Sequence, residues 1–209
     1  MSDQRRRRGP RGDITADGLA AAATAVLATV GPEGLSLRAV AREAGVTPTA
    51  IYTYYDDMAA LRNRVGDDFL GRLDLGLLRA GSPEQALHAF LDHGLALFAN
   101  SPGSVALLAS QRIAGPHSLA LNEALLDFFV DRVGHDLPGA VAATALVVEW
   151  VHGASMLAPS APVTSAFRAA LSRVDPARHP RTVEAFALPA DESAVLELLV
   201  TAVTTVRSP

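Results

Sequence analysis

Residues 39–55 limit the possible folds more than any other part of the chain. They contain two short patterns with apolar residues at helical spacing, and Gly45 lies between the two patterns. Glycine ends a helix at no steric cost because it adopts the left-handed backbone conformation. Pro48 stands where the second helix would begin, a position at which its missing N–H is not needed. We therefore predict two short helices joined by a tight turn.

The second of these helices has a buried side and a polar side. Ser36 and Thr47 are placed to cap the first and the second helix, respectively. Ile51 and Tyr55 are four residues apart, so both can pack against the first helix. The residues facing away from the core are Thr49, Ala50, Thr53 and Tyr54. This layout is typical of a DNA-binding helix-turn-helix, although an ordinary pair of bundle helices has the same spacing and remains the alternative.

Residues 34–47 (GLSLRAVAREAGVT) and 50–55 (AIYTYY) resemble the DNA-binding domain of TetR-family transcriptional regulators. The resemblance extends from about residue 13 to about residue 65. It implies an all-helical, dimeric repressor whose C-terminal domain senses a ligand. One position departs from the family pattern, because Met58 stands where a phosphate-contacting lysine usually follows the aromatic pair. This departure leaves the strength of binding to the DNA backbone open.

The expected partner of this domain is a palindromic double-stranded DNA operator, bound by a homodimer. The residues expected to contact bases or phosphates are Thr47, Thr49, Tyr52, Thr53 and Tyr54. Two residues at the start of the preceding helix, Ser36 and Arg38, are expected to contact the phosphate backbone.

Charge is unevenly distributed along the 209 residues. Residues 1–12 contain five arginines and one aspartate, a net charge of +4, whereas the whole chain carries −4 and the remainder therefore −8. A basic arm on an acidic body favours contact with a polyanion. Directly before a helix-turn-helix, such an arm favours the minor groove or the phosphates. The alternative is a solvated terminus without function.

Composition excludes several kinds of site. The chain has no cysteine, so disulfides, thiolate metal sites and cysteine nucleophiles are impossible. Hydrophobic residues make up 49% of the chain, as in globular proteins. We expect no apolar run long enough to span a bilayer, and the N-terminal arginines lead into no signal-like apolar segment. The expectation is a cytoplasmic protein with no membrane contact.

Helical spacing continues to the end of the chain without strand-like alternation, so we predict an all-α fold. The predicted parts are a disordered basic arm at residues 1–12, a three-helix helix-turn-helix domain at 13–66, and a helical-bundle domain for ligand binding and dimerisation at 67–209.

Three helices of the predicted bundle have an expected role. A long helix over residues 56–79 would join the two domains. The apolar segment 138–158 and the final helix 191–206 carry more apolar surface than a lone helix needs, so both are expected in the dimer interface. In the final helix, we expect one apolar stripe that includes Leu198 and Leu199.

A second resemblance concerns Trp150, His152 and Gly153, which resemble the C-terminal domain of a TetR subgroup named for tryptophan, histidine and glycine. Together with residues of two other predicted helices, they can line an apolar pocket that holds a few polar groups. The expected lining is Phe90, His93, Phe128, Phe129, Trp150, His152 and Met156. The expected effector is a small, largely apolar molecule. Simple filling of the bundle by these aromatic residues is the alternative.

Patterns that would support catalysis are incomplete. Glu149 and His152 have the spacing of di-iron helical bundles, but the motif occurs once. The chain has no nucleophile elbow and no phosphate-binding glycine loop. We expect no catalytic residue, metal or cofactor, and we predict a ligand-responsive dimeric repressor. The alternatives are a related module with weakened or lost DNA binding, which Met58 favours, and a helical-bundle enzyme.

Overall fold

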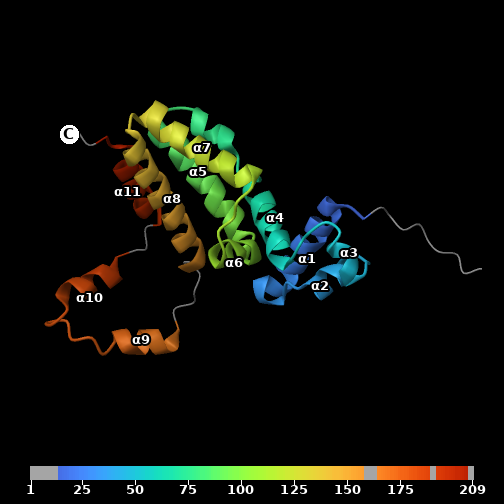
Figure 1. Ribbon diagram of the computed structural model, residues 1–209. Coiled ribbons are helices and arrows are strands. Elements are labelled where there is room, and N and C mark those ends of the chain that lie inside the picture. The colour runs from blue at the N-terminus through green and yellow to red at the C-terminus, as the bar shows by residue number, and fades with distance from the viewer. Residues whose placement is uncertain (1–13, 158–163, 189–191, 207–209) are drawn as a thin grey trace, which may run out of the picture. The chain divides into compact units, whose positions relative to one another are not determined.

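The computed structural model describes residues 14–157, 164–188 and 192–206. These residues form helices and connecting turns, and no strand occurs among them (Figure 1). The predicted all-α fold is confirmed. The basic arm predicted for residues 1–12 lies outside the described residues.

The chain packs as two compact units. The first runs to Asp74 and includes Ala96–Glu123, and the second comprises Leu75–Leu95 and the residues from Ala124 onward. These units are defined by how the helices pack. The predicted boundary after residue 66 instead divides DNA binding from ligand binding and dimerisation. The predicted division by role remains a proposal.

The first unit contains α1 (Ala16–Gly34), α2 (Leu37–Glu43), α3 (Pro48–Ile51), α4 (Met58–Leu70) and α6 (Pro102–Ser110). Its helices share one core, whose largest fully buried side chains are Leu19, Leu27, Leu35, Val40, Ile51, Leu61, Val65 and Leu107. Because Leu107 belongs to α6, this core extends beyond the three predicted N-terminal helices.

Two glycines determine how α1 ends and how closely α6 approaches it. The helix is interrupted at Gly31, whose φ of 70° and ψ of −179° are not helical, and one further turn follows through Gly34. The predicted break is therefore a kink inside α1. A Cβ atom on Gly103 would lie 2.6 Å from the carbonyl oxygen of Leu27. Only glycine therefore lets α6 pack this closely on α1.

The predicted single helix over residues 56–79 is wrong. α4 ends at Leu70, turns follow, and Leu75–Arg79 forms a separate 3-10 helix, η1. The N–H of Gly71 bonds the carbonyls of Asp67 and Phe69. A Cβ atom on Gly71 would lie 2.7 Å from the ring of His117, so this glycine makes room for a residue 46 positions later in the chain. The end of this helix therefore coincides with close packing against a distant residue, which local spacing does not indicate.

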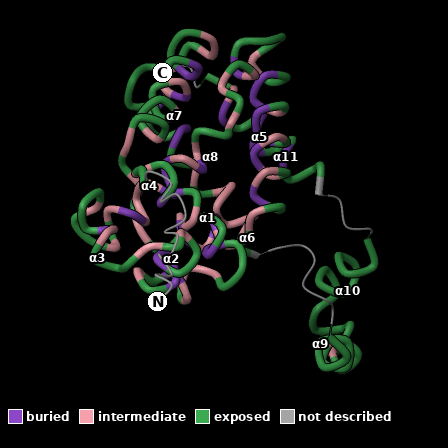
Figure 2. Tube along the Cα trace, turned by 90° about the vertical axis from the view of Figure 1, so that its right-hand side faces the viewer, coloured by how far each residue is buried: buried purple, intermediate pink, exposed green. Residues whose placement is uncertain are grey.

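The second unit holds most of α5 (Pro83–Ala99), the end of α7 (Pro116–Asp127), the π-helix η2 (Phe128–Val133), α8 (Leu137–Leu157), α9 (Ser165–Leu171), α10 (Pro180–Ala187) and α11 (Glu192–Thr204). Buried positions lie along α5, α8 and α11, whereas α9 and α10 contain no buried residue (Figure 2).

The final helix does not have the single apolar stripe that its sequence predicts. Leu198 is 72% exposed, but Leu199 is 7% exposed and belongs to the core. The buried face of α11 is formed by Leu196, Leu199, Val200 and Val203. A second apolar stripe, which includes Val195 and Leu198, faces outward. The helix therefore has one face for its own core and another that remains accessible.

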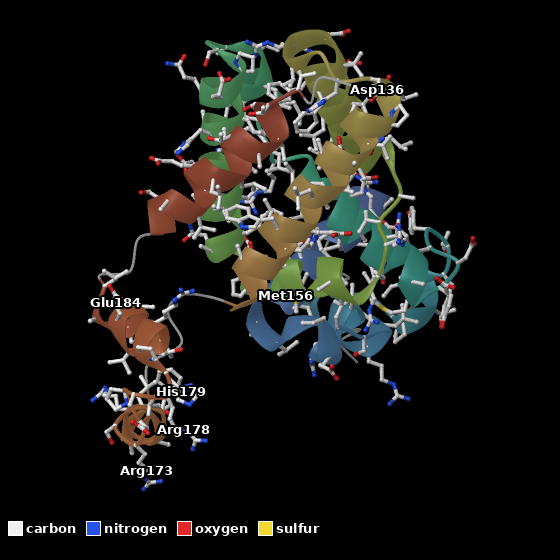
Figure 3. The ribbon with its side chains drawn as sticks, turned by 90° about the vertical axis from the view of Figure 1, so that its left-hand side faces the viewer. Asp136, Met156, Arg173, Arg178, His179 and Glu184 are labelled. Atoms are coloured by element: carbon white, nitrogen blue, oxygen red, sulfur yellow. The ribbon has the colours of Figure 1, made fainter. Side chains whose placement is uncertain are left out.

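α8 is the most apolar helix of the described chain. Its residues Leu137–Met156 have a mean hydropathy of 1.3, long and apolar enough by composition to cross a membrane. The expectation that no apolar run reaches this length is therefore wrong. A single such helix is weak support for a membrane span, because core helices of soluble proteins pass the same test. Its exposed apolar side chains are Leu137, Val141, Leu146 and Met156, of which Met156 is labelled in Figure 3.

Candidate nucleic-acid interface and candidate effector site

The turn between α2 and α3 has the predicted geometry. Gly45 has a φ of +67°, and the N–H of Val46 bonds the carbonyl of Ala41 at 2.9 Å. Ile51 is fully buried and Tyr55 is half-buried against the same core. The helix-turn-helix predicted from this stretch is confirmed.

The two predicted helix caps have different outcomes. The hydroxyl of Ser36 accepts a hydrogen bond from the N–H of Ala39 at 3.3 Å, as predicted. Thr47 makes no side-chain capping bond, which contradicts the prediction. Pro48 follows it and has no N–H, and the first turn is closed by the bond from the N–H of Ala50 to the carbonyl of Thr47. The hydroxyl of Thr47 therefore has no role in starting α3.

The side chains predicted to contact DNA are all exposed. They are Ser36, Arg38, Thr47, Thr49, Tyr52, Thr53 and Tyr54. We call this set the reading face. It belongs to α2, α3 and the turns that follow α3, which are held by bonds such as that from the N–H of Tyr54 to the carbonyl of Ile51 at 2.9 Å. Hydroxyl groups and aromatic rings on a short, firmly packed helix suit contacts with base edges and phosphates.

Tyr54 and Tyr55 also hold the start of α1 in place. The sequence did not indicate this role. The hydroxyl of Tyr54 donates to the carbonyl of Ile14 at 2.5 Å, and that of Tyr55 donates to the carbonyl of Ala16 at 2.8 Å. Burial raises the pKa of the Tyr55 phenol, and nearby Arg64 offsets part of that rise. These two bonds hold the chain that follows the basic arm next to the reading face.

Two arginines of α4 bond to both ends of α1. Arg64 donates to Asp17 at 2.7 Å and to Asp68 at 2.7 and 2.8 Å, and these bonds raise the pKa of its guanidinium, with Asp68 contributing more. Arg62 donates to the carbonyls of Pro32 and Leu35, both at 3.1 Å. The side chains of α4 therefore fix both ends of α1. No local sequence pattern indicates bonds across such separations.

Met58, which replaces the family lysine, is half-buried and packs against the core of the domain. Its neighbour Asp57 caps α4 by accepting a hydrogen bond from the N–H of Ala60 at 2.7 Å. Both residues therefore serve the fold. Neither supplies the positive charge that the family pattern places here.

The second half of α4 is bound to the start of α7 by side chains that the sequence did not single out. Asn63 forms a pair of bonds with the backbone of Ala114, at 2.7 and 2.9 Å. Asp67, only 2% exposed, accepts from the N–H groups of Ser118 at 2.8 Å and His117 at 3.2 Å. A buried carboxylate is stabilised by such donors at a helix N-terminus. We call this set of bonds the α4–α7 clamp.

The predicted effector residues all belong to the second unit, in differing environments. Phe90, Phe128 and Phe129 are buried, and the last two rings meet edge to face at 5.1 Å. His93, Trp150 and His152 are half-buried, and Met156 is exposed. The Nδ1 atom of His152 lies 2.8 Å from the carbonyl oxygen of Val148. The phenylalanines pack as core residues do, while the half-buried residues of α8 remain candidates for ligand contact.

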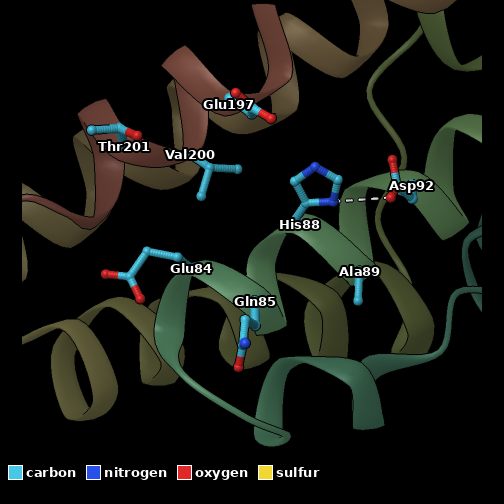
Figure 4. Close-up of a pocket in the computed structure, with 8 residues that line it drawn as sticks. All are labelled: Glu84, Gln85, His88, Ala89, Asp92, Glu197, Val200 and Thr201. Carbon is cyan, nitrogen blue, oxygen red and sulfur yellow. Dashed lines mark ion pairs between the residues drawn. The ribbon is translucent and has the colours of Figure 1, made fainter. Parts of the chain in front are cut away.

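A groove in the second unit lies elsewhere, between α5 and α11 (Figure 4). It has a volume of about 610 Å³ and contains none of the seven predicted effector residues. Its lining is Glu84, Gln85, His88, Ala89, Asp92, Glu197, Val200 and Thr201. His88 and Asp92 form an ion pair at 2.9 Å. The two walls of this groove are about a hundred residues apart in the chain, so no local sequence pattern predicts it.

The fold and the exposed reading face define a helix-turn-helix protein of the kind that regulates transcription. Residues 19–65 match the model of the "Bacterial regulatory proteins, tetR family". The transcriptional repressor DrrR1 of Streptomyces coeruleorubidus is 30% identical over 152 residues, 71% of this chain. The matched stretch spans about half, 55%, of that relative. The chain belongs to the TetR family of transcriptional regulators.

Solved structures share this fold across both units of the chain. The ligand-free form of ActR from Streptomyces coelicolor superposes with a TM-score of 0.82 at 16% identity, covering 93% of this chain and 97% of ActR. ActR bound to actinorhodin gives 0.76, also at 16% identity, over 92% and 95% of the two chains. BioQ bound to its double-stranded DNA operator gives 0.62 at 20% identity, over 91% and 98%. The family and the matched relative are transcriptional regulators, which sets the enzyme alternative aside.

Proposed function

We propose that this protein is a ligand-responsive repressor that binds a palindromic DNA operator as a homodimer and is released by a small, largely apolar effector. The observation that carries the proposal is the reading face, where all seven predicted contact residues are exposed on a firmly packed helix-turn-helix. The repressor name of the relative DrrR1 and the DNA complex of BioQ support the same role. The protein acts on DNA in the cytoplasm.

DNA recognition divides between base contacts and phosphate contacts. Thr49, Tyr52, Thr53 and Tyr54 belong to α3 and the turn after it, the part that enters the major groove in helix-turn-helix proteins. Ser36 and Arg38 stand at the start of α2, where helix N-termini and arginines bind phosphate. Thr47 precedes α3 and contributes its free hydroxyl to either kind of contact.

The basic arm adds a contact that depends on salt. The Tyr54 and Tyr55 hydroxyls hold the backbone at Ile14 and Ala16. The segment that precedes these residues in the sequence carries a net charge of +4. Each phosphate that the arm neutralises adds roughly 0.9 to the slope of log affinity against log salt. Deletion of residues 2–11 should therefore lower that slope, and an unchanged slope would identify an inert tail.

The dimer forms through the outward apolar faces of α8 and α11. Leu137, Val141 and Leu146 of α8 are exposed, as are Val195 and Leu198 of α11. Several large apolar side chains exposed on the same two helices are typical of a protein–protein interface. A symmetric dimer also presents two reading faces to successive turns of the major groove, about 34–36 Å apart.

Effector binding is transmitted through the α4–α7 clamp. α4 carries Arg62 and Arg64, which fix both ends of α1, and it also carries Asn63 and Asp67, which bind the start of α7. α7 then continues along the chain to Phe128 and Phe129, two of the predicted effector residues. A ligand releases DNA only if it prefers the arrangement that cannot bind DNA. ActR, which shares this fold, has been solved with actinorhodin.

One observation favours a second function, a ligand-binding or dimerisation module with weakened DNA binding. Met58 is packed into the core, and Asp57 caps α4, so the family's phosphate-binding lysine has no substitute at this place. If this function is correct, Met58→Lys should create operator affinity that the unchanged protein lacks.

A reporter strain that carries the operator separates effector sensing from DNA binding. Trp150→Ala should stay repressed when the effector is added, because the ligand site loses a wall. Thr53→Ala should be derepressed without effector, because the reading face is damaged. If Trp150→Ala responds like the parent, Trp150 only packs the bundle and the effector binds elsewhere.

A further inference from the structure

The segment from residue 164 to residue 188 has surface properties that the proposed function does not use. It contains α9 and α10, neither of which has a buried residue. The rings of Phe167 and Phe186 meet edge to face, with centroids 6.1 Å apart, so the two helices form a hairpin. Phe186 is nevertheless 57% exposed and Leu188 67% exposed. Phe167 and Val183 are exposed as well, and a group of large exposed apolar side chains on one short segment is typical of an interaction surface.

This hairpin is also basic on an acidic chain. It contains four arginines against Asp175 and Glu184, a net charge of +2, whereas the whole chain carries −4. Arg173, Arg178 and Arg181 are exposed, and Figure 3 labels the first two on this segment. A partner that fits the hairpin therefore needs acidic groups beside apolar surface.

The groove between α5 and α11 has this complementary chemistry. Glu84, Asp92 and Glu197 are exposed along it, and His88 pairs with only one of these carboxylates. Val200 and Ala89 supply apolar surface in the same groove (Figure 4). Arginine binds carboxylates in a two-pronged geometry, so an arginine-rich hairpin suits such a groove.

We propose that the α9–α10 hairpin of one subunit docks into the α5–α11 groove of a second copy of this chain. The proposal rests on the proposed homodimer. The hairpin joins the end of α8 to the start of α11, the two helices whose outward apolar faces form the proposed interface. The hairpin therefore lies between these two helices in the sequence, and its net positive charge complements the carboxylates of the groove on a second copy. Each subunit gives a hairpin and receives one, as two-fold symmetry requires.

Disulfide trapping tests this placement, and the natural absence of cysteine makes the readout clean. Arg181→Cys and Glu197→Cys variants, each with a different tag, are co-expressed as full-length chains and oxidised mildly. We expect a cross-linked product that contains both tags. The matched control pairs Arg181→Cys with Glu33→Cys, an exposed residue of α1, and should give no such product.

A double variant, Arg181→Cys with Glu197→Cys, distinguishes the competing occupant. Docking into the partner gives covalent dimers, whereas docking into the chain's own groove gives a cross-linked monomer and overturns the proposal. Sedimentation of the same samples under reducing conditions tests the homodimer itself. A dimer without cross-links refutes the hairpin contact alone, and a monomer refutes both proposals.

Charge reversal gives an independent check. Arg178→Glu with Arg181→Glu should weaken dimerisation about tenfold, because exposed ion pairs across an interface contribute modestly. Addition of Glu84→Arg and Glu197→Arg to the same chain should restore the affinity. Loss without restoration would contradict direct pairing of these groups.

Discussion

Thr53 and Tyr54 are neighbours on the reading face that we expect to act differently. Thr53→Ala removes a hydroxyl available for a base contact, which is worth about 1–3 kcal/mol. Tyr54→Phe removes only the hydroxyl that donates to Ile14, a bond worth about 0.5–1.5 kcal/mol. Fluorescence anisotropy should show the larger loss of operator affinity for Thr53→Ala. The slope of log affinity against log salt should fall only for Tyr54→Phe, because the backbone at Ile14, which follows the basic segment, loses this bond. Parental binding by both variants would contradict the assigned reading face.

Asp67 and Asp68 are adjacent carboxylates in α4 with unequal expected contributions to stability. Asp67→Ala leaves the N–H groups of His117 and Ser118 without their acceptor and should lower the free energy of unfolding by about 1–3 kcal/mol. Asp68→Ala breaks a half-exposed ion pair with Arg64 and should cost at most about 1 kcal/mol. Urea denaturation of both variants measures the difference. Equal losses would mean that the α4–α7 clamp contributes little.

Individual residues could be predicted from sequence where their role is local. Gly45 and Ser36 behave as expected because turn geometry and helix capping depend on residues within a few positions. Asp67 and Arg64 could not be predicted, because their partners lie about 50 positions away. The two bonds from Tyr54 and Tyr55 to the start of α1 were missed for the same reason.

At the scale of helices, the approach of α6 to α1 depends on Gly103. Gly103→Ala would place a Cβ atom 2.6 Å from the carbonyl oxygen of Leu27, so the two helices must separate, at a cost of about 1–3 kcal/mol. Gly153→Ala is the control, because a Cβ atom there meets nothing within 4 Å and alanine favours a helix by about 1 kcal/mol. Thermal unfolding should show a lower midpoint for the first variant only. A lower midpoint for both would contradict this packing.

The spacing of apolar residues predicts that a helix exists. It does not always predict where the helix ends or which of its faces is buried. The helix predicted for residues 56–79 ends at Leu70, where Gly71 packs closely against the ring of His117, a residue far away in the sequence. Leu198 and Leu199 look equivalent in sequence, yet only Leu199 packs into the core. Which of two apolar neighbours is buried depends on where the other helices lie, and spacing alone does not contain that information.

At the scale of the whole molecule, the same two leucines separate dimerisation from folding. Leu198→Glu should yield a folded monomer, because this side chain is 72% exposed on the proposed interface. Leu199→Glu should unfold the protein, because it places a charge at a position only 7% exposed. Analytical ultracentrifugation and circular dichroism distinguish the two outcomes. A stable dimer in the Leu198→Glu protein would remove α11 from the interface.

The central claim is that this chain reads a palindromic operator as a dimer through its helix-turn-helix. Its most direct test is selection of bound duplexes from a random DNA library by the full-length protein, with Thr53→Ala as the matched variant. We predict enrichment of one palindrome whose half-sites are about one helical turn apart, bound by one dimer, and loss of that enrichment in Thr53→Ala. Recovery of the input sequence distribution by the unchanged protein, or identical enrichment by Thr53→Ala, would contradict the claim.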